Sequence, residues 1–100
     1  MPIKKCVIGR PVKVFEGGTC IPVWFSSDVM KKQVPEVMAA LGVDRLGEEK
    51  LEGEIVFYVP TTATNLDEFV AAGEVLKARI KRQIDFDAVI SNRREPDAAF

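Results

Sequence analysis

Residues 54–90 read EIVFYVPTTATNLDEFVAAGEVLKARIKRQIDFDAVI, and this stretch decides the fold class. It opens with an apolar run at 54–59, which Pro60 ends, and closes with another apolar run at 86–90. Between the two runs, apolar residues recur every three or four positions, which predicts one amphipathic helix. A strand, a helix and a strand in succession favour a right-handed, parallel β-α-β crossover.

The predicted helix has a clear start and one apolar face. Thr64 or Asn65 can cap its first turn, and Asp67 and Glu68 suit the positive end of its dipole. Its apolar positions are Leu66, Phe69, Val70, Gly73, Leu76, Ile80 and Ile84. We expect this face to pack on the sheet.

The first quarter of the chain predicts strands joined by a hairpin. Apolar runs at 12–15 and 20–25 flank two glycines at 17–18, which suit a two-residue turn because such turns need positive φ. That turn would place Pro22 opposite Lys13. Because the run at 20–25 is apolar at every position, we expect both of its faces to be covered.

A shorter helix is predicted between residues 29 and 41, and Pro35 interrupts it. Either the helix kinks at Pro35, or a single turn precedes a new helix that has Pro35 at its first position. Gly42 is a natural stop. The charged, glycine-punctuated segment at 42–53 predicts a mobile loop.

Together these segments predict a single globular domain of the α/β or α+β class over residues 1–91, with residues 92–100 as a flexible tail. A strand at 4–8 comes first. The expected architecture is one mixed sheet of about five strands with an N-terminal β-hairpin, the β-α-β crossover and two helices packed on the sheet. One hundred residues suffice for such a core without disulfides or metal.

Composition argues against several classes of partner. The net charge is -1 without an evident basic patch, so nucleic-acid binding is not expected. No stretch of about eighteen apolar residues is present, so no membrane span is expected. The first residues contain no apolar signal core, which leaves the cytoplasm as the predicted location.

Cys6 and Cys20 each lie among apolar residues of predicted strands. A disulfide would need those strands to be neighbours and an oxidising compartment, so we expect two buried thiols. Two cysteines without histidine cannot build a common zinc site, and we predict neither metal nor cofactor.

Catalytic equipment is sparse. The absence of histidine removes the commonest acid–base group and the Ser-His and Cys-His nucleophile pairs. No Walker loop, dinucleotide fingerprint or calcium loop is present either. We predict no catalytic residue and favour a non-catalytic role, with an enzyme as the open alternative.

Polar residues follow three of the predicted strands. If those strands run parallel, their carboxyl ends meet at the edge where open α/β sheets bind ligands, close to helix N-termini that favour anions. The candidate ligand-binding residues are Ser27, Thr61, Thr62, Thr64, Asn65 and Arg93. The competing interpretation is that serine, threonine and asparagine simply cap helices there.

A second candidate surface lies on the far side of the long helix. Ala71, Val75 and Ala78 follow one another at four and three residues, nearly opposite the apolar face. They are candidate interface residues for a partner helix or another copy of the chain. The competing interpretation is that they are ordinary surface residues with no role in binding.

The N-terminal residues Met1-Pro2-Ile3, followed by a strand, resemble the start of tautomerase-superfamily chains. The resemblance implies a catalytic Pro2 amine after removal of the initiator methionine. It covers three residues, and a hairpin stands here where that family has a helix, so the chain is not assigned to it.

These features lead to two hypotheses of different class. The first is a small, non-catalytic cytoplasmic protein that binds a protein partner or self-associates as a homo-oligomer, with a regulatory role open. The alternative is a small enzyme or binding protein for an anionic or phosphorylated ligand at the carboxyl edge of the sheet.

Overall fold

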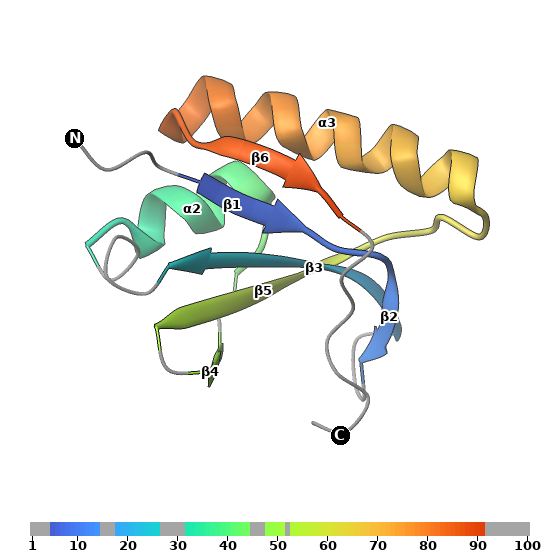
Figure 1. Cartoon of the computed structure of the whole chain (residues 1–100), viewed down its shortest axis with the longest axis horizontal. Helices are drawn as coiled ribbons and strands as arrows, with labels where there is room; N and C mark the ends of the chain where they lie inside the picture. The colour runs from blue at the N-terminus through green and yellow to red at the C-terminus, as the bar shows by residue number, and fades with distance from the viewer. Residues whose placement is uncertain (1–4, 15–17, 27–31, 45–47, 52, 92–100) are drawn as a thin grey trace.

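Six strands and two helices make up the described part of the chain, which in this computed structural model comprises residues 5–14, 18–26, 32–44, 48–51 and 53–91 (Figure 1). The strands are β1 (Lys5–Ile8), β2 (Val12–Val14), β3 (Gly18–Ser26), β4 (Glu48–Leu51), β5 (Glu54–Pro60) and β6 (Asp87–Ile90). The helices are α2 (Val34–Leu41) and α3 (Leu66–Ile84). The predicted tail at 92–100 lies outside the described residues.

The strands form one mixed sheet in the order β4-β5-β3-β1-β6, with β2 paired to β3. β1 pairs parallel with β6, whereas the β1–β3, β3–β5 and β4–β5 pairs are antiparallel. β5 and β6 therefore run in the same direction, and α3 connects them across β3 and β1. The predicted class, a mixed sheet with an N-terminal hairpin, a β-α-β crossover and two helices, is confirmed.

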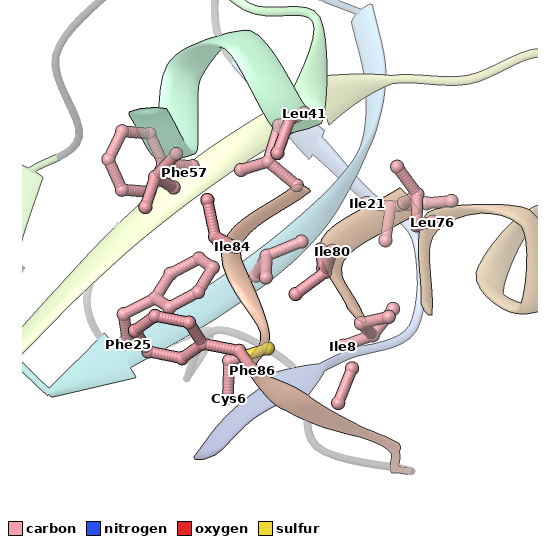
Figure 2. Close-up of a cluster of buried hydrophobic side chains, with 14 of the residues drawn as sticks. Cys6, Ile8, Ile21, Phe25, Leu41, Phe57, Leu76, Ile80, Ile84 and Phe86 are labelled. Carbon is pink, nitrogen blue, oxygen red and sulfur yellow. The ribbon is translucent and has the colours of Figure 1, made fainter. Parts of the chain in front are cut away.

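Both helices cover the same face of the sheet. In β3, the alternate residues Ile21, Val23 and Phe25 point into one apolar cluster with residues of α2 and α3 (Figure 2). The intervening residues Cys20 and Trp24, on the other face of β3, are also buried. This two-sided burial agrees with the apolar character of the whole 20–25 run.

Phe25, near the end of β3, is buried in the core and joins distant parts of the chain. Its ring meets that of Phe57 in β5 edge-on, with centroids 5.8 Å apart, and that of Phe86 just before β6 at 5.4 Å (Figure 2). Edge-to-face contacts of this kind add to the free energy of burial. The cluster therefore ties the antiparallel half of the sheet to the crossover.

α3 approaches the sheet closely at Gly73. A Cβ atom at this position would lie 3.1 Å from Cδ1 of Ile90 and 3.9 Å from Cγ2 of Ile8. A glycine inside a helix costs up to about 1 kcal/mol relative to alanine, so its presence here has a packing reason. The absent side chain lets α3 lie directly over the parallel β1–β6 pair.

A helix starts within one residue of Pro35, as the second interpretation predicted, whereas most of the segment before it lies outside the described residues. α2 begins after Gln33 and carries Pro35 in its first turn, where a missing N–H costs little. Gly42 ends it with φ 72°, in the left-handed conformation that glycine adopts easily.

Two details of the predicted strands are wrong. Lys13 pairs with Thr19, and Val14 pairs with Gly18, which is a different register from the predicted one, and residues 15–17 lie outside the described residues. Pro22 instead pairs with Tyr58 of β5. Gly18, with φ 70°, is the last paired residue of the ladder and so cannot belong to a two-residue turn.

The segment at 42–53, predicted to be a mobile loop, contains β4. Glu48 pairs with Val56 and Glu49 pairs with Ile55. β4 lies at the end of the strand order, where a strand is paired on one side and charged residues are tolerated. β4 therefore forms because it pairs with the apolar strand β5, and not because its own sequence has an apolar pattern.

The buried face of α3 is narrower than predicted. Phe69, Gly73, Leu76, Ile80 and Ile84 are buried, as expected. In contrast, the exposed fraction is 58% for Leu66 and 42% for Val70. Successive residues turn by about 100° around a helix, which places Val70 roughly 90° from the middle of the buried stripe.

Among the described residues, neither helix combines the length and the apolar character that crossing a membrane would require.

Candidate functional site

The carboxyl ends of β5 and β6 point toward one edge of the sheet because the two strands run in the same direction. The backbone N–H of Thr61, directly after β5, donates to the carbonyl oxygen of Thr19 at 3.1 Å. The N–H of Ser91, directly after β6, donates to the carbonyl oxygen of Ile8 at 2.9 Å. Residues that follow both strands are thus held at this edge by the ladder itself.

The third predicted strand does not end there. β3 runs antiparallel to β5, and its last residue, Ser26, pairs with Glu54 at the start of β5. The expectation that all three strands share an edge is therefore wrong for β3. Ser27 and Arg93 lie outside the described residues, as does Pro2.

Polar residues at the start of α3 bind one another. The Glu68 Oε1 atom accepts hydrogen bonds from the Thr64 hydroxyl at 2.7 Å and from the Asn65 side-chain amide at 2.9 Å. In return, Asn65 Oδ1 accepts from the Glu68 backbone N–H at 2.9 Å. This arrangement resembles a capping box, except that Glu68 accepts from the side chains of Thr64 and Asn65, and it places a carboxylate of the chain itself at the positive end of the helix.

The two threonines before this cap differ in their surroundings. Thr61 is half-buried, and its Oγ1 accepts from the N–H of Ala63 at 3.2 Å, which shapes the turn that leaves β5. Thr62 is exposed. Of the candidate ligand-binding residues that the structure describes, Thr61, Thr64 and Asn65 have local structural partners.

A shallow pocket of about 190 Å³ opens beside this cap. Its polar part comes from Arg10, Thr64 and Asn65. Its apolar part comes from Pro11, Ala63, Leu66 and Phe69. The exposed Leu66 is thereby explained, because the first turn of α3 borders this pocket rather than the core.

Sequence reasoning missed Arg10 as a pocket residue. Arg10 follows β1, which runs parallel to β6 and toward the same edge. The signal was available, because Arg10 directly follows a predicted strand just as Thr61 does. The run Gly9-Arg10-Pro11 was instead interpreted only as the end of that strand.

The outer face of α3 is exposed along its whole length. Ala71, Val75 and Ala78 are all exposed, and the exposed fraction of Val75 is 59%. Val75 lies near the middle of a helix of 19 residues whose opposite face forms the core. Their placement away from the sheet is as the helical spacing predicted.

Cys6 and Cys20 are both buried, and neither is in a disulfide. Cys6 pairs with Phe25, which lies five residues along β3 from Cys20, so the two are about 17 Å apart along the strand. A disulfide needs Cα atoms within about 7 Å. Burial raises the pKa of the Cys6 thiol from 9.0 to about 12, and the Asp87 carboxylate adds to this effect. Burial also raises the pKa of Cys20.

Charged residues at the start of β6 form a small network with α3. The Lys81 Nζ atom lies 2.7 Å from Asp85 Oδ1 and 3.5 Å from Asp87 Oδ1. The hydrogen bond to Asp85 and the charges of both carboxylates raise the pKa of Lys81. All three side chains are well exposed, so the network contributes little to stability.

Within the described ranges, no three side chains of histidine, cysteine, aspartate or glutamate come together as a metal site would require. Comparison of the chain with protein-family models, with curated proteins and with solved structures finds no match in any of the three. In the part of the chain that the structure describes, the outer face of α3 and the pocket beside its cap are the two candidate functional surfaces.

Proposed function

We propose that this chain is a non-catalytic cytoplasmic protein that binds another protein chain, or a copy of itself, through the outer face of α3. The observation that carries the proposal is the exposure of Val75 between Ala71 and Ala78 at the middle of the helix. Small side chains on both sides of an exposed valine let another backbone approach closely. The absence of histidine supports a non-catalytic role, and two buried cysteines that form no disulfide fit a reducing compartment.

The test is native mass spectrometry of the tagged full chain, purified gently from cells that make it. We expect the wild-type chain to carry a second chain at fixed stoichiometry. Val75→Glu should abolish this complex, because it would bury an unpaired charge in the contact. Gln83→Glu is the matched control, since it adds the same charge to the same helix at an exposed position away from the face.

Two outcomes would contradict the proposal. One is a monomer with no accompanying chain at high protein concentration. The other is a complex that survives Val75→Glu as well as it survives Gln83→Glu, because its contact would then lie elsewhere. Circular dichroism of each variant would establish that the fold is intact.

The alternative, an anionic ligand at the carboxyl edge of the sheet, is favoured by Arg10 in the pocket beside Thr64 and Asn65. The Glu68 carboxylate argues against this alternative, because it already accepts hydrogen bonds from the side chains of Thr64 and Asn65. An added anion would lie near this carboxylate, which weakens its binding.

This alternative predicts that phosphate-bearing compounds raise the Tm, because a ligand bound only to the folded state stabilises it. Arg10→Ala, Thr62→Ala and Arg93→Ala should each reduce the shift in a thermal unfolding experiment. A shift that survives all three substitutions, or no shift with any such compound, would eliminate this site.

A further inference from the structure

The charges on α3 are separated along the helix. Its first turn carries Asp67 and Glu68, and its last turn carries Lys81 and Arg82. All four side chains are exposed. The helix therefore presents one acidic end and one basic end, and both lie on exposed surface.

The same residues line up with the small apolar positions between them. At about 100° per residue, Asp67, Ala71, Val75, Ala78 and Arg82 all fall within roughly 50° of the direction opposite the buried stripe. They form one continuous face, which we call the outer stripe. It is acidic at its start, small and apolar in its middle, and basic at its end.

We propose that the occupant of the outer stripe is a second copy of this chain, with its α3 packed antiparallel across a two-fold axis near Val75. This inference rests on the proposed function and names its partner. In this arrangement Asp67 faces Arg82 of the second copy, and Ala71 faces Ala78 of the second copy. Each contact occurs twice, as a two-fold interface requires.

Charge decides between the two orientations. A parallel pair would set Asp67 against Asp67 of the second copy and Arg82 against Arg82 of the second copy. The antiparallel pair replaces both repulsions with attractions, which fixes orientation more than it adds affinity. The small residues Ala71 and Ala78 at the middle allow the two helices to approach closely.

The contact is small, because one face of a single helix supplies it. Interfaces below about 1,200 Å² in total are typical of weak, reversible association. The dimer should therefore form as concentration rises from micromolar to millimolar. It should weaken in high salt, since its charges are at the solvent-accessible ends.

Glu74 gives the inference an internal check. It is exposed, it lies at the level of the two-fold axis and it flanks the outer stripe about 60° from its middle, so Glu74 of the second copy lies at the same level on the same flank. Two like charges there oppose association. Glu74→Gln should strengthen the dimer, and a weaker dimer would contradict the proposed axis.

The deciding experiment is sedimentation equilibrium with two charge reversals, Asp67→Arg and Arg82→Asp. Each variant alone sets like charges together twice, and we expect its self-association to fall about tenfold. Mixing the two variants restores opposite charges at both contacts, so a heterodimer should form about as readily as the wild-type dimer. Asp67→Asn and Arg82→Gln provide the same test with smaller effects if a reversal disturbs the fold.

The outcomes separate this inference from the proposed function. A wild-type chain that stays monomeric but holds a different protein through Val75 overturns the second copy and leaves the proposed function standing. A dimer that Val75→Glu breaks, but whose reversed variants show no preference for each other, overturns the antiparallel arrangement. A dimer that Val75→Glu leaves intact overturns both.

Discussion

The burial of the Cys6 thiol makes the stability of the folded chain depend on pH. Cys6 is 2% exposed, and the thiol pKa of about 12 in the folded state compares with 9.0 for the free group. Folding therefore favours the protonated thiol. Between these two values the unfolded chain releases a proton that the folded chain keeps, so stability falls as pH rises.

The first prediction follows from this sign. The Cys6 thiol should lower the free energy of unfolding by about 1.4 kcal/mol between pH 7.5 and pH 10, with the full contribution present below pH 9. Cys6→Ala removes the titrating group, so its destabilisation relative to wild type should be about 1.4 kcal/mol smaller at pH 10. Urea unfolding at both pH values measures the difference, and an equal cost at the two would show that the thiol is not desolvated.

The cap of α3 provides a second prediction at this scale. Asn65→Ala removes the acceptor of the Glu68 N–H and should cost about 1 kcal/mol in the free energy of unfolding. Asn65→Ser keeps a side-chain oxygen that can accept from this N–H and places no second carboxylate beside Glu68, so it is the matched control. Chemical denaturation of both variants measures this, and equal destabilisation by the two would contradict the role of the side-chain oxygen.

At the scale of elements, the position of α3 depends on Gly73. Alanine there gains about 1 kcal/mol in helix propensity, but its Cβ would press on Cδ1 of Ile90 at 3.1 Å. Valine at position 90 lacks that terminal carbon. Removing this one methyl group would therefore relieve the closest contact that a Cβ at position 73 would make with the last strand.

A double-mutant cycle tests the coupling between positions 73 and 90. We expect Gly73→Ala to be more favourable in the Ile90→Val background than in the wild type by about 0.5–1 kcal/mol. Gly73→Leu should destabilise the protein by about 1–3 kcal/mol or more, because the larger side chain overpacks the space between α3 and the sheet. It is the positive control for a steric clash at this position. Additive effects of Gly73→Ala and Ile90→Val in thermal unfolding would mean that α3 does not touch β6 closely at this point.

Helices and strands with local sequence signals were predicted, and those that depend on distant pairing were not. The helix at 66–84 and the strand after it were predicted, because helical spacing is a local signal. Capping chemistry left Thr64 or Asn65 as the cap, and the structure shows Asn65. β4 was missed, since Glu48 and Glu49 carry no apolar alternation and the strand exists through its pairing with β5. The hairpin register depends on which glycine takes positive φ, and two adjacent glycines do not encode that choice.

The candidate surfaces were predictable to different degrees. The exposure of Ala71, Val75 and Ala78 follows from angle alone, so the outer face of α3 was accessible to sequence reasoning. The pocket was not, because Arg10 and Asn65 approach one another only through the sheet order. Likewise, the antiparallel direction of β3, which removes its end from this edge, is a long-range property that no local motif records.

At the scale of the whole molecule, Phe25 contacts the rings of Phe57 and Phe86 and so links β3, β5 and the residue before β6 within the core. Phe25→Ala should cost about 3–5 kcal/mol, because the cavity would separate the rings of Phe57 and Phe86. For a domain of this size, the Tm should fall by at least about 12 °C. Phe25→Leu keeps most of the volume and should cost markedly less. Calorimetry of both variants checks this, and similar losses would mean that ring contacts rather than filled volume dominate.

The parallel pairing of β1 with β6 governs how the chain reaches its folded state. The first described strand acquires this neighbour only after the last one has been made, so the sheet stays open at β1 throughout synthesis. Contacts between such distant segments slow folding, because a long loop must close before they contribute. An incomplete chain would expose the edge of a central strand, and the nascent protein would be most vulnerable to aggregation at that stage.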